Sequence, residues 1–219
     1  MENTDRSTNN RMVLLLIAGI PVTIILSATW LWYFVVQGDL DLVGALGTAN
    51  RGVLLQPPRQ IDEVELLDPD GVRFRNADLD PRWAMLVPGA GGVCDTSCEQ
   101  SLYVTRQIHT ALGKEYNRIR RLYVSGSAPG DTSLKVTELS DQRPAPASFS
   151  ALLEDEHRGV KPLVLSPGQP DTLFVEYQSE PSTWYLVDPS GWIMMSYDSS
   201  IPYKDVIADL KFLLKNSGD

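Results

Sequence analysis

One stretch of this sequence can fold in essentially one way, an uncharged apolar run from Met12 to Val36 (MVLLLIAGIPVTIILSATWLWYFVV). A helix of about 20 residues spans the hydrocarbon core of a membrane, and this run is long enough to do so with some tilt. Trp30, Trp32 and Tyr33 lie near its end, where aromatic belts meet the membrane surface. Because a cleaved signal peptide has an apolar part of only about 7–15 residues, residues 12–36 are predicted to be an uncleaved transmembrane anchor.

The charges on either side of this run predict its orientation. Arg6 and Arg11 precede the run, whereas Asp39 and Asp41 follow it and the next basic residue is Arg51. The positive-inside rule then places residues 1–11 in the cytoplasm and everything after residue 36 outside it. We therefore expect a single-pass protein of a bacterial inner membrane with its C-terminal part in the periplasm, where disulfides persist.

The remaining chain is predicted to comprise a tether and one domain. Residues 37–60 are rich in glycine and proline, which favours a tether, and residues 61–219 have the length of a single domain. The formal net charge is -9 and no basic run is present, so a nucleic-acid partner is excluded. With two histidines and no paired acid and base, the sequence gives little support for hydrolase chemistry.

Cys94 and Cys98 are the only cysteines, and they form the motif Cys-Asp-Thr-Ser-Cys after an apolar run. Thr96 and Glu99 have the spacing of a capping box, which predicts that a helix starts here with Cys98 in its first turn. A helix N-terminus favours negative charge, and the thiolate is the reactive and metal-binding form of cysteine. The pair is therefore predicted to perform redox or soft-metal chemistry.

Turn signals and apolar patterns predict the order of elements around the cysteines. Two Asp-Pro-x-Gly turns, at 68–71 and 188–191, each separate two candidate strands and predict β-hairpins. The other predicted strands are 83–87, 119–124, 163–165 and 173–176, and the predicted helices are 96–114, 149–156 and a last one opened by Pro202. This order predicts an α/β thioredoxin-like fold, a central mixed sheet flanked by helices, with the cysteines at the site that is active in that fold.

The stretch from Val64 through Cys98 resembles the Sco/SenC family of membrane-anchored, thioredoxin-like proteins that assemble cytochrome c oxidase. The matching features are a hairpin, Asp78-Leu79, the strand WAMLV, the pair Cys94-x-x-x-Cys98 and a late hairpin around Pro189. The resemblance implies copper binding through the two cysteines and a distant histidine, or thiol reduction of the oxidase copper site. It also implies that an oxidase subunit or another assembly factor is the partner.

Two departures from the family pattern bear on copper. Asp95 stands where the family usually has proline, and Glu180 stands where its histidine is expected. His109 follows Cys98 by eleven residues on one helix, about 16 Å away, and is predicted to be a partly buried helix residue rather than a ligand. His157 lies in a charged segment predicted to be an exposed loop, in which Glu154 to Glu156 form a solvated face. Weak Cu(II) binding is expected, although two thiolates alone can hold Cu(I).

Two functional hypotheses follow. In the first, Cys94, expected to be the more exposed cysteine, attacks the disulfide of a partner and Cys98 resolves the mixed disulfide, so that the protein is a thiol–disulfide oxidoreductase. In the second, the protein is a non-catalytic assembly or interaction protein with a degenerate fold and a structural disulfide.

Thioredoxin folds also carry a cis-proline opposite the cysteines, and Pro181 has the matching position.

Overall fold

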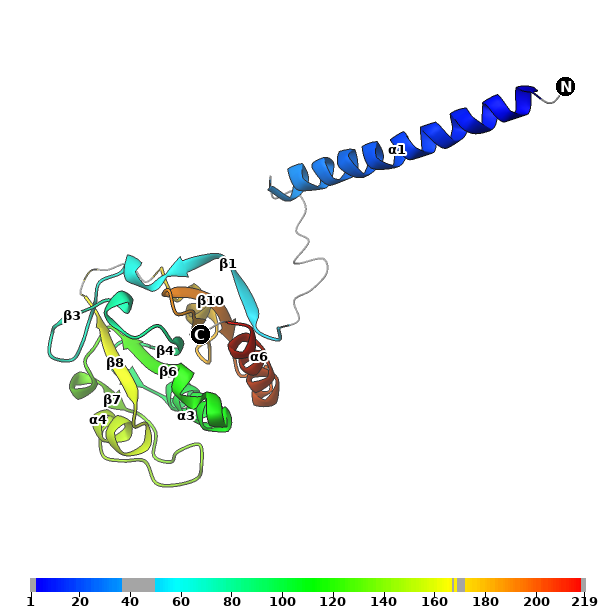
Figure 1. The fold of residues 1–219 in the computed structure, drawn as a ribbon. Coiled ribbons are helices and arrows are strands. Elements are labelled where there is room, and N and C mark those ends of the chain that lie inside the picture. Colours follow the sequence, from blue (N-terminus) through cyan, green and yellow to red (C-terminus); the bar gives the residue numbers. More distant parts are fainter. Residues whose placement is uncertain (1–2, 37–49, 167, 169–171, 218–219) are drawn as a thin grey trace. The chain divides into compact units, whose positions relative to one another are not determined.

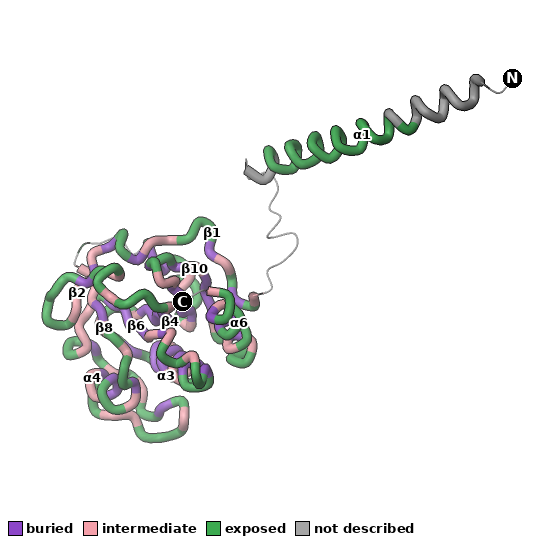
Figure 2. Tube along the Cα trace, in the orientation of Figure 1, coloured by how far each residue is buried: buried purple, intermediate pink, exposed green. Residues whose placement is uncertain are grey.

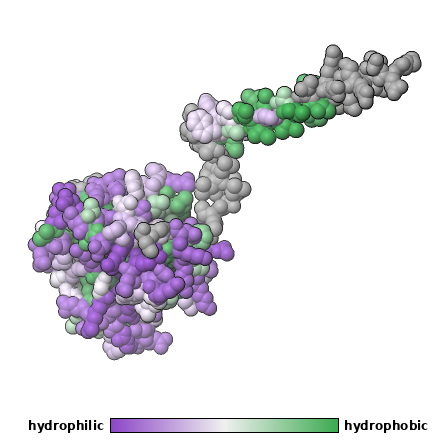
Figure 3. Space-filling view, viewed as in Figure 1, coloured by the Kyte–Doolittle hydropathy of each residue, from purple (hydrophilic) through white to green (hydrophobic). Residues whose placement is uncertain are grey.

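The computed structural model describes residues 3–36, 50–166, 168 and 172–217, and it divides the chain into two units, residues 1–49 and 50–219 (Figure 1). In the first unit, helix α1 runs from Asn3 to Val36 and contains the predicted anchor. Its segment Leu15–Tyr33 is the one helix in the described chain that is long and apolar enough to cross a membrane. Figure 3 shows its hydrophobic surface, whereas the visible face of the second unit is mainly hydrophilic.

The second unit contains ten strands and four helices in its described part. The strands are β1 (Val53–Gln60), β2 (Leu66–Leu67), β3 (Arg73–Phe74), β4 (Trp83–Gly89), β5 (Val93–Cys94), β6 (Ile119–Ser125), β7 (Ser133–Leu134), β8 (Val160–Leu165), β9 (Trp184–Val187) and β10 (Trp192–Tyr197). The helices are α3 (Thr96–Ala111), α4 (Phe149–Ala151), α5 (Val175–Ser179) and α6 (Tyr203–Asn216). Short helical turns are η1 (Ile61–Glu63), η2 (Asn76–Asp78), η3 (Gly113–Arg118), η4 (Pro129–Asp131) and the π-helical η5 (Leu152–Glu156).

Eight strands form one mixed sheet in the order β1-β10-β9-β4-β6-β8-β2-β3. The three central strands β4, β6 and β8 are parallel, and β9 and β10 continue the sheet as an antiparallel hairpin. Helix α3 connects β4 to β6, as a parallel pair requires a crossover. Both predicted hairpins and the predicted order of strand, cysteine loop, helix and strand are confirmed.

The sheet is buried on both faces, and its central strand β4 is buried from Ala84 to Pro88 (Figure 2). In β4, Met85 and Val87 join one core cluster, and Ala84 and Leu86 join the other. This alternation follows from the two-residue period of a strand. The first cluster is covered by α3, α4 and α6, and it includes both cysteines; the second is covered by η1 and the residues before α5.

The predicted tether covers residues 37–60. Of these, residues 50–60 instead belong to the second unit, and residues 37–49 lie outside the described chain. Residues 53–60 form β1, which pairs with β10 through an irregularity between Leu54 and Arg59. Pro57 and Pro58 occupy this irregular part, and proline cannot donate a ladder hydrogen bond. Their presence made an edge strand resemble a linker.

Three smaller expectations were wrong. Residues 173–176 are not a strand, because α5 begins at Val175, and α3 ends at Ala111 rather than at residue 114. The cis X-Pro bond of the described chain is Gln56–Pro57, not the one before Pro181.

Candidate functional site

Cys94 and Cys98 are joined by a disulfide at the junction of β5 and α3, with 5.2 Å between their Cα atoms. Cys94 is the last residue of β5, and Cys98 lies in the first turn of α3, as predicted. The turn is closed by Asp95, whose Oδ1 accepts a hydrogen bond from the backbone N–H of Cys98 at 3.1 Å. Asp95, rather than Thr96, is therefore the N-cap, and the predicted capping box is wrong.

Both sulfur-bearing residues are buried. Cys94 is 0 % exposed and Cys98 is 2 % exposed, so the expectation that Cys94 is the more exposed cysteine is wrong. The reason is the long connection between β6 and β7 and onward to α4, residues 126–148, here called the covering segment. It was not anticipated as part of the site.

The covering segment contacts the cysteines through its backbone. Its strand β7 pairs in parallel with β5, so that Cys94 lies opposite Leu134. The N–H of Lys135 donates to the carbonyl oxygen of Cys94 at 2.8 Å, and Leu139 is buried in the same core cluster as the disulfide. In this conformation the segment limits the access of another thiol to the disulfide.

Glu99, the residue after Cys98, binds the covering segment instead of capping its own helix. Its buried carboxylate accepts hydrogen bonds from Ser140, from the backbone N–H at 3.1 Å and from the hydroxyl at 2.5 Å. A hydrogen bond to a charged acceptor contributes about 1.5–3 kcal/mol. This contact therefore attaches the covering segment to the first turn of α3.

A group of charged side chains provides a second attachment further along α3. Arg106 donates to the carboxylate of Glu156 at 2.9 Å and lies 3.6 Å from that of Asp141 in the covering segment. Arg143 contacts both of these carboxylates. These bonds lower the pKa of both Asp141 and Glu156, the hydrogen bond from Arg143 being the largest cause. Glu156 is thus part of an ion-pair network and not of the solvated face that the sequence suggested.

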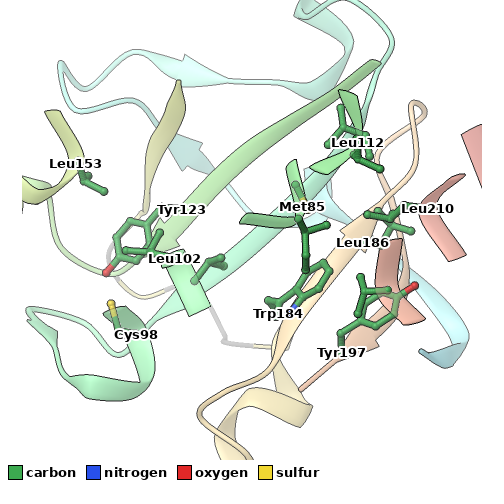
Figure 4. Close-up of a cluster of buried hydrophobic side chains, with 14 of the residues drawn as sticks. Met85, Cys98, Leu102, Leu112, Tyr123, Leu153, Trp184, Leu186, Tyr197 and Leu210 are labelled. Atoms are coloured by element: carbon green, nitrogen blue, oxygen red, sulfur yellow. The ribbon is translucent and has the colours of Figure 1, made fainter. Parts of the chain in front are cut away.

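The hydroxyl group of Tyr123 lies on the inner side of the site. Tyr123 is 1 % exposed, and its ring packs against Phe149 with 5.0 Å between centroids. In Figure 4 its hydroxyl and the sulfur of Cys98 point toward one another. The hydroxyl has no hydrogen-bond partner within the described chain, and burial raises the pKa of Tyr123 to about 12.

His109 occupies a structural position on α3, away from the disulfide. It is buried, it stacks on Tyr116 with 3.8 Å between ring centroids, and its Nε2 lies 2.8 Å from the carbonyl oxygen of Tyr116. Burial lowers its pKa. The prediction that this histidine is a helix residue rather than a ligand agrees with these contacts.

His157 is buried, so its prediction as a residue of an exposed loop is wrong. It follows η5, whose Leu152 and Leu153 enter the core and turn the chain inward. Burial, with the nearby guanidinium groups of Arg106 and Arg121, lowers the pKa of His157 to about 3. These neighbours place it beside the second half of α3 rather than beside the cysteines.

The described residues do not fit a three-ligand copper site. No group of three or more His, Cys, Asp or Glu side chains in this part of the chain is arranged to hold a metal ion. Glu180, at the expected histidine position, is exposed and accepts a hydrogen bond from the Ser182 hydroxyl at 2.8 Å. The two sulfurs are the soft donors that remain, and they are joined to each other.

The sequence carried a signal for Tyr123 but not for the covering segment. Alternation along the predicted strand 119–124 places Tyr123 on the same face as Ile119, which faces α3. The covering segment is rich in serine, proline and aspartate, and its apolar residues have no regular spacing. Such a composition predicts a surface loop and gives no sign of what it covers.

Solved structures with a similar fold include Sco proteins. Yeast Sco1 is 17% identical, with a TM-score of 0.51, over 79% of this chain and 99% of that chain. Copper-bound ScoI of Bradyrhizobium japonicum is 18% identical, with a TM-score of 0.46, over 68% of this chain and 96% of that chain. BsSco, described with a disulfide switch and as a member of the Sco family of cytochrome c oxidase assembly proteins, is 15% identical, with a TM-score of 0.45, over 78% and 99%.

At 17% identity the likeness to yeast Sco1 concerns the fold alone. No curated protein matches the chain. A family described as the transmembrane-like, thioredoxin-like, C-terminal domain matches residues 83–217, which is more than half of the chain and includes both cysteines. The chain therefore belongs to this family of transmembrane-like proteins with a thioredoxin-like C-terminal domain.

Proposed function

We propose that this protein is a membrane-anchored thiol–disulfide oxidoreductase that acts through Cys94 and Cys98 in the biogenesis of cytochrome c oxidase. The observation that carries the proposal is the Cys94–Cys98 disulfide at the start of α3. The N–H groups of a helix's first turn stabilise a thiolate, which is the nucleophilic form of cysteine, and a sulfur whose thiol has a lower pKa is also the better leaving group. A purely structural cross-link gains little here, because in the entropic model a short loop stabilises least.

In the proposed reaction the reduced pair transfers two electrons to a disulfide of the partner. The Cys94 thiolate attacks one partner sulfur, and a mixed disulfide forms as the other partner sulfur leaves as a thiolate. The Cys98 thiolate then attacks the Cys94 sulfur, which releases the partner as a dithiol and forms the Cys94–Cys98 bond. The assignment of Cys94 as the attacking residue rests on its position before the helix, next to the exposed Val93, since burial does not distinguish the two.

The proposed reaction requires the covering segment to move. Because both cysteines are buried, a partner reaches Cys94 only when residues 126–148 move away from β5. The attachments to be broken are the β5–β7 pairing, the contact between Glu99 and Ser140, and the ion pairs of Arg106. These attachments are polar and are replaced by water on opening, whereas opening also takes Leu139 out of the core cluster that contains the cysteines.

The oxidase as destination and copper as cargo are drawn from the similar structures. Copper is bound in the Bradyrhizobium japonicum protein, and BsSco belongs to a family of cytochrome c oxidase assembly proteins. For this chain we propose an oxidase subunit or an assembly factor as the partner, with Cu(I) handling by the two thiolates as a variant. We also propose that α1 anchors the domain on the periplasmic side of a bacterial inner membrane, as the flanking charges Arg6, Arg11, Asp39 and Asp41 favour.

The second candidate function is a non-catalytic assembly or interaction protein with a structural disulfide. The burial of both cysteines beneath the covering segment favours it. The two functions differ in reduction potential, because structural disulfides of exported proteins lie below about -300 mV.

Trapping of partners tests the proposal in cells. The Cys98→Ser variant should accumulate mixed disulfides on Cys94, because the resolving thiol is missing, whereas the matched Cys94→Ser variant should accumulate far fewer. The readout is the set of partner complexes that dissociate on reduction in a diagonal gel. A double Cys94→Ser, Cys98→Ser variant that supports normal oxidase levels, at normal abundance and without the wild-type chain, would end the redox proposal and leave the interaction role.

A further inference from the structure

The hydroxyl of Tyr123 is a buried donor that makes no hydrogen bond within the described residues, and it belongs to the same core cluster as the Cys94–Cys98 disulfide. Tyr123 comes from β6, where it faces the core cluster that contains both cysteines. Figure 4 shows its hydroxyl and the Cys98 sulfur directed at one another. Burial is the largest cause that raises the pKa of Tyr123, and the charge of Asp95, which lies between the cysteines, is a smaller one. The hydroxyl therefore lies at the inner wall of the disulfide site.

The described residues around Tyr123 leave space for this hydroxyl and form no hydrogen bond with it. A Cβ atom on Gly89 would lie 2.1 Å from the hydroxyl oxygen of Tyr123, so only a glycine at position 89 leaves room for this hydroxyl. The nearby Ser125 hydroxyl donates to the carbonyl oxygen of Ser127 at 2.9 Å and accepts from its N–H at 3.1 Å. Its second lone pair is directed so that Tyr123 makes no hydrogen bond of acceptable geometry with it, although the two hydroxyl groups are close enough for Ser125 to act on the pKa of Tyr123. An unsatisfied buried hydroxyl costs about 1–3 kcal/mol, and phenylalanine would fill the same space without that cost.

We infer that Tyr123 is a positioning residue of the redox pair. Its hydroxyl donates a hydrogen bond to the Cys98 sulfur once the disulfide is reduced. A disulfide sulfur is a weak acceptor, whereas a thiolate is a charged one and forms a strong hydrogen bond. The hydroxyl is thus unsatisfied in the oxidised state and satisfied in the reduced state. Tyr123 consequently favours the reduced pair and makes the disulfide a stronger oxidant. This inference rests on the proposed thiol–disulfide exchange and concerns the same site.

The sign of the effect follows from the two states. Reduction by a dithiol breaks the Cys94–Cys98 bond, two electrons pass to the two sulfurs, and the dithiol becomes a disulfide. Removing the hydroxyl with Tyr123→Phe takes a hydrogen bond from the reduced state and an unsatisfied group from the oxidised state. Both changes favour the disulfide. We expect the equilibrium constant for disulfide formation to rise about tenfold, which equals about 30 mV for this two-electron couple.

The experiment equilibrates the full-length protein in detergent with dithiothreitol redox buffers and counts free thiols by alkylation and mass. The Tyr123→Phe midpoint should lie about 30 mV below the wild-type midpoint. The matched control is Tyr197→Phe, because the Tyr197 hydroxyl is also buried in this cluster but is bonded to Asp209 at 3.3 Å. The control should lose stability and keep the wild-type midpoint.

A second measurement separates the hydrogen bond from packing. The pH dependence of alkylation of the reduced protein reports the thiol pKa, which should rise by about one unit in Tyr123→Phe and stay unchanged in Tyr197→Phe. An unchanged midpoint and thiol pKa in Tyr123→Phe, or an equal shift in the control, would overturn the inference while leaving thiol–disulfide exchange intact. A wild-type midpoint below about -300 mV would instead count against the proposed function, and the difference between the variants would still be measurable.

Discussion

The carboxylate of Glu99 accepts a hydrogen bond of 2.5 Å from the hydroxyl of Ser140, which attaches the covering segment one residue beyond Cys98. The same carboxylate accepts a second bond from the Ser140 backbone N–H at 3.1 Å. Since Glu99 is buried, neither bond is replaced by water in the closed state. The contact is therefore well placed to control how often the disulfide becomes accessible.

Removing the hydroxyl should speed reaction at the disulfide. Ser140→Ala keeps the backbone bond to Glu99 and loses the charge-assisted one, which contributes about 1.5–3 kcal/mol. If the covering segment must open first, the rate of reduction by dithiothreitol should rise at least about tenfold, because each 1.4 kcal/mol corresponds to a factor of ten. The rate is measured by quenching the reaction with an alkylating agent at fixed times and counting the free thiols by mass.

The matched control for that experiment is Ser182→Ala. Ser182 also donates its hydroxyl to a glutamate, Glu180, at 2.8 Å, but on the exposed loop before β9 rather than on the covering segment. It should leave the reduction rate unchanged. Equal rates in wild type and Ser140→Ala would show that the disulfide reacts without opening of this contact.

His157 should make the stability of the domain depend on pH between about 6.5 and 3. Burial, with Arg106 and Arg121, lowers its pKa to about 3 from about 6.5, so the unfolded state binds more protons in this range. Stability contributed by the neutral histidine is therefore complete above about pH 6.5 and is lost as the pH falls, by about 2 kcal/mol between pH 7 and pH 5. The pKa values of Glu156 and Asp141 are also lowered, so the stability that their ionised forms contribute to the domain is lost as the pH falls further.

Replacing the imidazole with an amide isolates its share. The His157→Gln variant should unfold in urea with a free energy that changes by about 2 kcal/mol less than in wild type between pH 7 and pH 5. His109→Gln provides a comparison, since burial lowers the pKa of His109 as well. An unchanged pH slope in His157→Gln would mean that this side chain is solvated and protonated in the folded state.

The parts of the fold that were predicted are those fixed by local chemistry. Asp68 and Asp188 each open an Asp-Pro-x-Gly turn, and both hairpins form around them. The wholly apolar β4 could only be a central strand. By contrast, the two prolines Pro57 and Pro58 predict a tether where the structure has β1, because they interrupt its pairing with β10. Leu55, which precedes them in the strand, is buried.

The sequence predicts where the cysteines lie in the fold, but it does not predict that they are buried. Helix-start chemistry near residue 96 placed Cys98 in the first turn, but Asp95 competes with Thr96 for the cap, and its side chain prevails. Burial of Cys94 depends on residues 126–148, which lie far along the chain and carry no local pattern. Contacts between distant segments, such as Glu99 with Ser140, have no signature in a single sequence.

The orientation of α1 is tested with reporters on the full chain. Arg6 and Arg11 before the apolar run, and Asp39 and Asp41 after it, predict that alkaline phosphatase fused to the C-terminus is exported and active. The same reporter placed after Arg11 should be inactive and serves as the control. An inactive C-terminal phosphatase, beside an active cytoplasmic reporter at the same site, would reverse the orientation and remove the oxidising compartment from the argument.

Copper binding should follow the thiols alone. Two thiolates suit Cu(I), and the described chain has no third donor arranged with them. The reduced full-length protein should take up Cu(I) and lose this ability in either Cys94→Ser or Cys98→Ser, whereas Cu(II) should produce no thiolate charge-transfer absorption. A tight one-to-one Cu(II) complex with that absorption would contradict the donor set derived from the structure.

A histidine at position 180 should restore part of the missing donor set. The loop that carries Glu180 approaches α3 near the cysteines, because the carbonyl oxygen of Ser182 accepts a hydrogen bond from Ser101, one turn beyond Cys98, at 3.3 Å. Glu180→His should therefore strengthen Cu(II) binding at least about tenfold and introduce thiolate charge-transfer absorption, both measured by titration of the reduced protein. Glu154→His, which places the same ligand on an exposed residue of η5, is the matched control and should do neither. Equal effects of the two variants would mean that an added histidine binds Cu(II) without the cysteines, and that position 180 has no special relation to the cysteine pair.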